Sequence, residues 1–587
     1  MSRAHPRAAL PSSNNQNETL LKKLINDPRS VVREMLEGLV DSSGHLALVE
    51  NENIVVQRDL PQAASRKVAI ISGGGSGHEP AHAGYVGEGM LTAAVAGDVF
   101  TSPSVDAILA AILTAAGPAG ALLVVKNYTG DRLNFGLAAE LARDQGIPVE
   151  IVVVADDVSL RGRVSPERRR GIAGTVLVHK VAGAAAAQGK PLHAVAALAT
   201  QAAHSLASIG VGLGSCTVPA AGTPSFTLAD DEIELGLGIH GEKGVRRDTM
   251  KPADAIVDDM LEAILTDLTE RPQPNINRIA LMVNGLGGTP PMELQIVARR
   301  ALAVLRERGF HVERVWVGNY MTALEMPGCS LTILPVDDAT LTLLDAPAQA
   351  SGWQAGARVT ERITLAGIPA ASTAVITTTE GPLAPRLKEI VLAVADALEA
   401  AEAQLTDLDS QTGDGDLGAS LARGAQAMRA LPGHAFHAPD ALLLELGKAL
   451  RRAIAGSSGP FYATALVRAA RHLNGMAQPS ASDWQAAFAK AAHAISEIGG
   501  AKTGDRSMYD ALASAADEWQ AALAQEDSRA AFNRAAEAAE RGAQQTASML
   551  PRLGRASYLG ERALGIPDGG AVAVAIWLRA IAQAISK

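Results

Sequence analysis

Two different patterns of apolar residues follow one another in this chain of 587 residues, and they restrict its fold more than any other feature. Up to about residue 340, short β-branched runs alternate with glycine turns and with stretches rich in alanine and leucine, which is typical of α/β layering. The runs expected to form buried strands are 67–72, 121–125, 149–155, 279–284 and 312–317. Such runs on both sides of 225–275 predict two α/β lobes.

The second pattern begins near residue 386. Leu387, Val391, Val394 and Leu398 recur at helical spacing, and similar patterns continue almost to Lys587 with hardly any strand signal. The predicted fold is therefore an α/β N-terminal half with two lobes, followed by an all-α helical domain. We expect a flexible N-terminal segment at 1–28, the α/β domain at 29–350, a linker at 351–385 and the helical domain at 386–587.

Composition excludes several classes of function. The net charge of −10 argues against a nucleic-acid partner, which requires a basic face. The basic run at 161–171 is interpreted as a solvated loop, with an anion site as the alternative. Two cysteines cannot form a disulfide framework, and no uninterrupted apolar stretch reaches the ~20 residues of a membrane span. Without a signal-peptide pattern, we expect a cytoplasmic protein with no membrane partner.

The stretch GGGSGHEPAH at 73–82 fits three kinds of site. A P-loop is excluded because no Gly-Lys-Ser/Thr follows, and the dinucleotide pattern has His78 where a glycine belongs. A zinc-protease helix is disfavoured because Pro80 favours a helix start, which leaves His78 in the loop and His82 on the first turn. A strand that ends in a glycine loop at a ligand pocket remains, and so does a histidine merely hydrogen-bonded in a turn.

Three further loops place polar side chains after expected strands. They are GDVFTSPS at 97–104, KNYTGDRLNFG at 126–136 and LGLGIHGEKG at 235–244, which carries His240 between glycines. Loops at the carboxyl ends of strands converge on one edge of a sheet. The four loops together therefore favour a small-molecule pocket.

These motifs, together with RGIAGTVLVHKVAGA, SCTVP, VNGLGGTPPMEL and MTALEMPGCSLT, resemble the substrate domain of dihydroxyacetone (glycerone) kinases from about residue 30 to 340. The resemblance implies that His240 adds through its imidazole to the substrate ketone as a covalent hemiaminal. It further implies that Asp131, with His78 beside it, takes the proton from the attacking hydroxyl. The residues implied to hold the hydroxyls are Gly75, Ser76, Gly77, His78, Lys126 and Asp131.

The helical half has an acidic cluster of its own in DLDSQTGDGDLGASL at 407–421. Asp409, Asp414 and Asp416 can be gathered by a turn, and Mg²⁺ favours such oxygen ligands. A solvated acidic loop explains the same spacing. The loop AGSSGPFYATAL at 455–466 enters a helix, which is typical either of phosphate binding at a helix N-terminus or of an ordinary capped turn.

TGDGDLG, GSSG, GGAKTGDRSMYDAL and GRASYLGERALGIPDGGA resemble the helical nucleotide-binding domain of the same kinases, from about 386 to 585. The resemblance implies that the three aspartates hold two Mg²⁺ ions on ATP. Leu417, and Gly569 within Asp568-Gly569-Gly570, depart from the commoner family residues, which puts the assignment of those nucleotide contacts in doubt. The implied nucleotide-binding residues are Gly418, Ala419, Ser420, Leu421, Gly456, Ser457, Ser458, Gly499, Ser507, Met508, Asp568, Gly569 and Gly570.

The implied activity is that of a glycerone kinase, which transfers the γ-phosphoryl group of Mg-ATP to dihydroxyacetone, other short ketoses or glyceraldehyde. The resemblance also implies a homodimer in which the nucleotide domain meets the partner chain's substrate domain. The alternatives are erythrulose phosphorylation, cleavage of FAD to a cyclic flavin phosphate, and use of a phosphoprotein donor with ADP as cofactor. A non-enzymatic ketose sensor is the last alternative, and it would not need the three aspartates.

Overall fold

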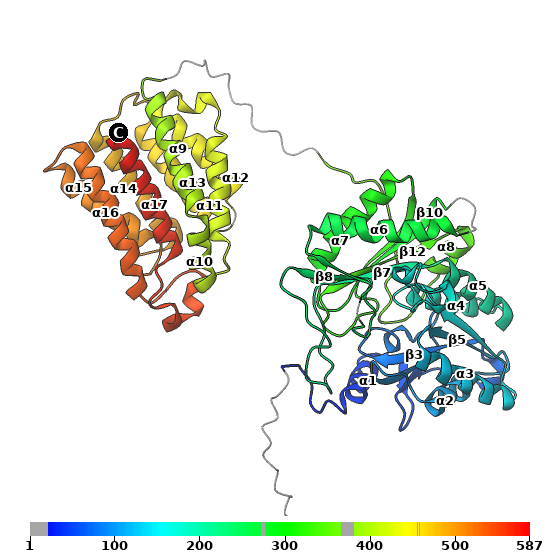
Figure 1. The fold of residues 1–587 in the computed structure, drawn as a ribbon. Coiled ribbons are helices and arrows are strands. Elements are labelled where there is room, and N and C mark those ends of the chain that lie inside the picture. Colours follow the sequence, from blue (N-terminus) through cyan, green and yellow to red (C-terminus); the bar gives the residue numbers. More distant parts are fainter. Residues whose placement is uncertain (1–21, 243, 272–275, 366–380, 455, 457) are drawn as a thin grey trace, which may run out of the picture. The chain divides into compact units, whose positions relative to one another are not determined.

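A computed structural model describes residues 22–587 apart from 243, 272–275, 366–380, 455 and 457. The chain divides into two compact units, one ending at Thr364 and the other beginning at Leu365 (Figure 1). The first unit is α/β with two sheets and the second is helical, as the sequence predicts. Most of the predicted N-terminal segment and the middle of the predicted linker lie outside the described residues.

The first sheet holds the glycine-rich stretch on a central strand. Its order is β1-β2-β4-β3-β5-β6, and β3 pairs in parallel with both β4 and β5. Successive side chains of a strand point to opposite faces, so Ile70 packs toward one layer of helices and Ile71 toward another. The strands are β1 (Leu46–Leu48), β2 (Ile54–Gln57), β3 (Ala69–Ser76), β4 (Ala93–Val99), β5 (Ala121–Lys126) and β6 (Val149–Val154).

The second sheet has the order β13-β11-β10-β12-β7-β8-β9, with β10 and β11 parallel and the other pairs antiparallel. It draws strands from both sides of 225–275. The second lobe already begins at β7, because β7 pairs with β12. The strands are β7 (Ala207–Gly212), β8 (Glu232–Leu235), β9 (Arg246–Thr249), β10 (Arg278–Gly285), β11 (His311–Gly318), β12 (Gly328–Pro335) and β13 (Ala357–Arg358).

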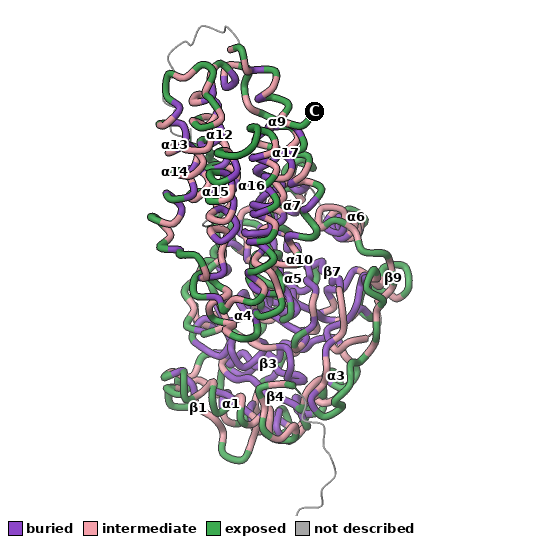
Figure 2. The backbone as a smooth tube through the Cα atoms, turned by 90° about the vertical axis from the view of Figure 1, so that its left-hand side faces the viewer, coloured by how far each residue is buried: buried purple, intermediate pink, exposed green. Residues whose placement is uncertain are grey.

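Helices cover both faces of each sheet in layers. One face of the first sheet packs on α2 and α3, and one face of the second sheet packs on α6 and α7. The layer of α4 and α5 shares one core cluster with residues of both sheets, which buries β3 along its length (Figure 2). The helices are α1 (Val31–Asp41), α2 (Val105–Ala115), α3 (Thr129–Asp144), α4 (Thr175–Ala187), α5 (Leu192–Ser205), α6 (Ala253–Glu270), α7 (Pro291–Glu307) and α8 (Asp338–Asp345).

The segment after β3 differs from the expectation, because no α-helix begins at Pro80. Residues 77–92 form an irregular path with one short 3₁₀ turn, Ala83–Tyr85. The carbonyls of Gly84 and Glu88 accept hydrogen bonds from the amides of Gly352 and Gln349 at 2.8 and 2.9 Å. The backbone thus pairs with a distant segment of the unit instead of within a helix.

The helical unit closes on itself. Contacts run from α9 through α11, α12, α13, α14, α15, α16 and α17 back to α9, and α10 packs beside α11. One helix of the described chain, α17, is long and apolar enough to cross a membrane, but 56% of that stretch is buried inside this unit. The helices are α9 (Ala384–Ala400), α10 (Glu402–Thr412), α11 (Leu417–Arg429), α12 (Pro439–Ala453), α13 (Ser458–Leu473), α14 (Ala481–Gly499), α15 (Met508–Leu523), α16 (Ser528–Gln545) and α17 (Gly569–Ser586).

Candidate active site

His240 lies in the loop between β8 and β9, with its side chain 17% exposed. Its backbone amide donates to Oε2 of Glu242 at 2.9 Å, and its Nδ1 lies 3.4 Å from Oε1 of the same carboxylate. Burial opposes ionisation of Glu242, but the hydrogen bond and charge of His240 lower the pKa of the Glu242 carboxyl to about 2. A carboxylate only accepts, so Nδ1 carries the proton and the lone pair of neutral His240 is on Nε2.

His78 meets His240 from the glycine loop, with 4.8 Å between the ring centroids. Its Nδ1 lies 2.8 Å from the carbonyl oxygen of Thr322 in the second lobe, so Nδ1 is the donor. Burial, together with the charges of His240 and Lys126, lowers the pKa of His78 well below its usual range. Its buried Nε2 has no protein partner and is therefore an acceptor for a ligand hydroxyl.

Lys126 and Asp131 form a buried ion pair in the same region. Lys126 ends β5, Asp131 lies in the first turn of α3, and Nζ is 3.6 Å from Oδ2. Ser102 donates to the other carboxylate oxygen of Asp131. A Cβ at Gly74 would lie 2.3 Å from Nζ of Lys126, so only glycine at 74 leaves room for the lysine.

Two aromatic rings enclose the histidines. The ring of Tyr128 lies 4.5 Å from that of His240, and the ring of Phe100 lies 5.1 Å from that of His78. The phenol of Tyr128 is buried without a protein partner, and burial raises its pKa well above the usual value. An apolar wall with a few polar groups is typical of a small-molecule pocket.

The predicted glycine-loop residues lie along this site. Gly75 and Ser76 end β3, and the Ser76 hydroxyl donates to the carbonyl of Gly97 at 2.8 Å. The amide of Gly77 donates to Glu79, and the carbonyl of Gly77 accepts from the amide of Leu324 in the second lobe. The loop therefore connects the two lobes of the α/β unit.

The basic run at 161–171 is largely neutralised by acidic residues of the protein. Arg161 pairs with Glu270, Arg169 with the buried carboxylate of Asp267 at 2.8 Å, and Arg170 with Asp157 at 2.7 Å. These pairs tie the run to the two lobes. The solvated-loop interpretation is wrong for Arg169, which is buried, and for Arg170, which is half-buried, whereas Arg161 and most of the run are exposed as expected.

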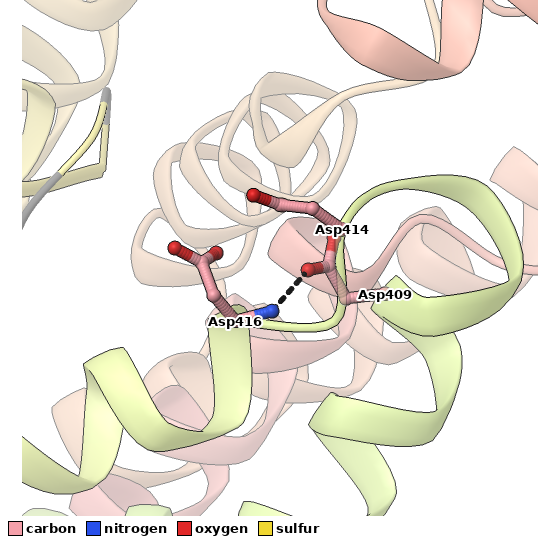
Figure 3. Close-up of side chains that lie close together, drawn as sticks. All are labelled: Asp409, Asp414 and Asp416. Atoms are coloured by element: carbon pink, nitrogen blue, oxygen red, sulfur yellow. Dashed lines mark hydrogen bonds between the residues drawn. The ribbon is translucent and has the colours of Figure 1, made fainter. Parts of the chain in front are cut away.

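The three aspartates of the helical unit come together, as Figure 3 shows. Asp409 lies in the last turn of α10, Asp414 lies in the turn and Asp416 is at the N-cap position of α11, with one carboxylate oxygen of each within 4.8 Å of the others. The amide of Asp416 donates to Oδ2 of Asp409 at 2.9 Å. Among the described residues this is the one cluster with metal-ligand geometry, and its oxygen donors fit Mg²⁺. Asp414 also pairs with Arg555.

Helix N-termini gather around this cluster. A Cβ at Gly569, the first residue of α17, would lie 2.8 Å from Leu417 of α11, and one at Gly570 would lie 3.4 Å from Met508 of α15. Tyr462 lies near the start of α13, and burial, together with the negative charge of Asp568, raises the pKa of its phenol. The positive ends of four helices beside three carboxylates form an environment suited to a phosphate chain and its cation.

Asp568 caps α17 from a buried position, where it accepts from the amide of Ala571 at 2.8 Å. Burial raises the pKa of its carboxyl to about 6, against the attraction of Arg506. Arg506 is 2% exposed and donates to the carbonyl of Ile566 at 2.9 Å, while two of its nitrogens have no protein partner. This arginine holds the loop that leads to the α17 cap.

The predicted nucleotide residues differ in where they lie in the helical unit. Ser458, Ser507, Met508, Asp568, Gly569, Gly570 and Gly418 lie at the starts of helices, whereas Ser457 lies outside the described residues. The side chain of Leu421 is buried in the core, Ser420 accepts from Arg423, and Ala419 lies in the first turn of α11. Gly499 ends α14 against the ring of Phe461, and Gly456 precedes α13 with a φ of +70°.

Several residues of the site were not named as site residues from the sequence. Glu242, Tyr128 and Thr322 all lie within the quoted motifs. Glu242 and Tyr128 could have been found because each lies two positions along the chain from a predicted site residue, His240 or Lys126. Thr322 could be found only by its contact with His78. His82, treated only as a zinc candidate, instead contacts Lys126. Ser102 could be found only by its hydrogen bond to Asp131.

Two histidines in contact, a buried lysine–aspartate pair and three clustered aspartates on one chain form an arrangement suited to a two-part phosphotransferase. The family models agree: a Dak1 domain matches residues 37–352 and a DAK2 domain matches residues 411–583. The chain belongs to the single-chain dihydroxyacetone kinase family.

Similar proteins match over nearly the whole chain. A triokinase/FMN cyclase of Homo sapiens is 42% identical over 96% of this chain and 100% of its own. A D-erythrulose kinase of Mycolicibacterium smegmatis is 34% identical, with 96% and 99% covered. The crystal structure of the dihydroxyacetone kinase from C. freundii in complex with AMP-PNP and Mg²⁺ is 35% identical, covers 96% and 99%, and has a TM-score of 0.60.

Proposed function

We propose that this enzyme transfers the γ-phosphoryl group of Mg-ATP to a terminal hydroxyl of dihydroxyacetone held as a covalent hemiaminal on His240. The observation that carries the proposal is the contact of His240 with Glu242, which leaves the Nε2 lone pair available to a carbonyl carbon. Nε2 forms the new C–N bond as the carbonyl π bond breaks, Nδ1 releases its proton through Glu242 to solvent, and the carbonyl oxygen takes up one proton from solvent to become a hydroxyl. Glycerol has no carbonyl and cannot be held in this way.

Proton transfer is assigned to the buried carboxylate. In this proposal Asp131 takes the proton of the attacking hydroxyl, and Nε2 of His78 accepts a hydrogen bond from the ketose. Lys126 donates to a ketose hydroxyl and keeps a positive charge beside Asp131. Gly75, Ser76 and Gly77 form the wall of the pocket.

The phosphate donor is assigned to the helical unit. The AMP-PNP and Mg²⁺ of the C. freundii complex support ATP and Mg²⁺ as cofactors here. Asp409, Asp414 and Asp416 would hold two Mg²⁺ ions, which neutralise phosphate charge during transfer. The helix starts at Leu417, Ser458, Met508 and Gly569 would face the nucleotide. We further propose a cytoplasmic homodimer in which each helical unit serves the partner's ketose site.

Two relatives supply second candidates on the same site. The D-erythrulose kinase makes a four-carbon ketose an alternative substrate, and the triokinase/FMN cyclase makes cyclisation of a flavin nucleotide an alternative reaction. In both alternatives the three aspartates would still hold the metal ions and the helix starts would still face the nucleotide phosphates.

The test combines native mass spectrometry with a coupled kinase assay. Wild type incubated with dihydroxyacetone should gain the mass of one ketose per chain, and His240→Ala should gain none and lose ATP-dependent phosphorylation. His204→Ala, which changes an exposed histidine, is the matched control and should behave as wild type. An adduct that persists in His240→Ala would disprove the covalent site, and ATP turnover without any adduct would point to another substrate.

A further inference from the structure

A buried hydrogen-bond network contacts Lys126, and its other members have no role in the proposed reaction. The network consists of Ser72 on β3, His82 in the segment after β3, and His179 on α4. All three residues are buried. Oγ of Ser72 lies 3.3 Å from Nδ1 of His82 and 3.1 Å from Nε2 of His179. On its other side, Nε2 of His82 lies 2.9 Å from Nζ of Lys126.

The protons of this network can be assigned from its partners. Ser72 has one hydroxyl proton and donates it to the carbonyl of Val124 at 2.6 Å. Toward both histidines Ser72 is therefore an acceptor, so His82 carries its proton on Nδ1 and His179 on Nε2. Burial, with the charge of Lys126, lowers the pKa of His82 well below its usual range and that of His179 to about 3. Both rings are neutral, and Nε2 of His82 presents a lone pair.

That lone pair fixes the lysine. Three protein groups surround the ammonium of Lys126: Nε2 of His82 at 2.9 Å, the carbonyl of Gly73 at 3.4 Å and Oδ2 of Asp131 at 3.6 Å. The contact with Asp131 is longer than a hydrogen bond, so the third proton remains for the ketose hydroxyl. A lysine with no other good acceptor would close onto the carboxylate at about 2.8 Å, the usual length of a charge-assisted hydrogen bond. Here the shortest contact is to the histidine, so Oδ2 of Asp131 stays available to a further donor.

We propose that His82 is a positioning residue for phosphoryl transfer, which holds Lys126 back from Asp131 through a lone pair that Ser72 keeps on Nε2. The inference rests on the proposed function, because it assigns the freed carboxylate oxygen to the ketose hydroxyl. The charged or titratable groups that face His82 are Lys126, His179 and His78. Loss of the lone pair lets the lysine neutralise the base.

Two amide substitutions at position 82 test whether the lone pair on Nε2, and not the imidazole ring as such, is what positions Lys126. Gln at 82 places its amide oxygen where Nε2 lies and can still accept from Lys126, whereas Asn reaches only the place of Nδ1. With dihydroxyacetone as substrate, kcat of His82→Asn should fall by about tenfold or more, since small errors in positioning are costly in catalysis. His82→Gln should stay within about threefold of wild type, and Ser72→Ala should follow His82→Asn.

The ketose adduct on His240 distinguishes positioning from folding. His82→Asn should still gain the mass of one ketose in native mass spectrometry and keep the KM for ATP, because its defect lies in proton transfer. Equal losses in the Asn and Gln variants, or full activity in both, would overturn the inference. A wild-type enzyme that phosphorylates no ketose would overturn the proposed function itself, and that result comes before any variant is measured.

Discussion

Asp568, a residue of the proposed nucleotide site, lowers the stability of the folded chain when its carboxyl is ionised. Its carboxyl is buried at the start of α17, and burial raises its pKa to about 6 from 3.8. Between these values the folded chain keeps a proton that the unfolded chain has lost, so stability falls as pH rises through this window. Above pH 6 the cost is about 3 kcal/mol at most, since each pKa unit corresponds to about 1.4 kcal/mol.

Asp568→Asn should remove this cost and keep the helix cap, because an amide oxygen also accepts from the amide of Ala571. In calorimetry with EDTA, the variant should be stabilised at pH 7.5, and about half of the gain should remain at pH 5. Its KM for ATP should rise, since the residue is assigned to the nucleotide site. A gain that is equal at both pH values would show that the charge of Asp568 is not the cause.

At the same scale, the sequence predicts residues of the site when they lie in a loop with a chemical pattern. His78, Lys126, Asp131 and His240 are predicted in this way, and the structure places all four in one region. The role of His82 depends on Ser72 and Lys126, which are 10 and 44 positions away. No local pattern predicts such a network, because only the packing of β3 against β5 brings these residues together.

The elements around the site depend on close packing of backbone on backbone. Gly183 of α4 lies against the loop before β4, and a Cβ there would lie 2.3 Å from Cα of Met90. Gly183→Ala should therefore destabilise the α/β unit by about 1–3 kcal/mol, the usual cost of overpacking. The measurement is the urea midpoint of the full chain, with unfolding monitored by tryptophan fluorescence.

Gly38→Ala is the matched control for this change. Gly38 is also helical, in α1, but a Cβ there meets nothing within 4 Å. The substitution should leave stability unchanged or raise it by up to about 1 kcal/mol, because alanine favours the helix. Equal effects at the two positions would mean that helix propensity, and not the contact with Met90, decides the outcome.

The elements that the sequence predicted correctly are those with a strong period. The five expected strands overlap β3, β5, β6, β10 and β11. β3, β5 and β10 are apolar runs buried on both faces, and β6 and β11 are apolar runs of which only some residues are buried. The expected helix at Pro80 was wrong, and the carbonyls of Gly84 and Glu88 there accept hydrogen bonds from the amides of Gly352 and Gln349. Such pairing over more than 260 positions has no trace in local propensity.

At the scale of the whole molecule, the chain separates two chemical tasks. The α/β unit holds the histidine proposed to bind the ketone and the proposed base, and the helical unit holds the carboxylates and helix starts proposed for Mg-ATP. The change of apolar pattern near residue 386 predicts this division, since it follows from composition and periodicity alone. Which chain's helical unit serves which ketose site depends on assembly, and the sequence pattern has no bearing on it.

A complementation experiment decides between transfer within a chain and transfer across a dimer. His240→Ala keeps an intact helical unit, and Asp416→Ala keeps an intact ketose site, so each variant alone should be inactive. If transfer crosses the dimer, random exchange makes half of the dimers mixed, each with one intact pair of sites, and about a quarter of wild-type activity returns. The measurement is ketose phosphorylation after subunit exchange, with mixed dimers verified by native mass spectrometry. Mixed dimers without activity would show that each helical unit serves the ketose site of its own chain.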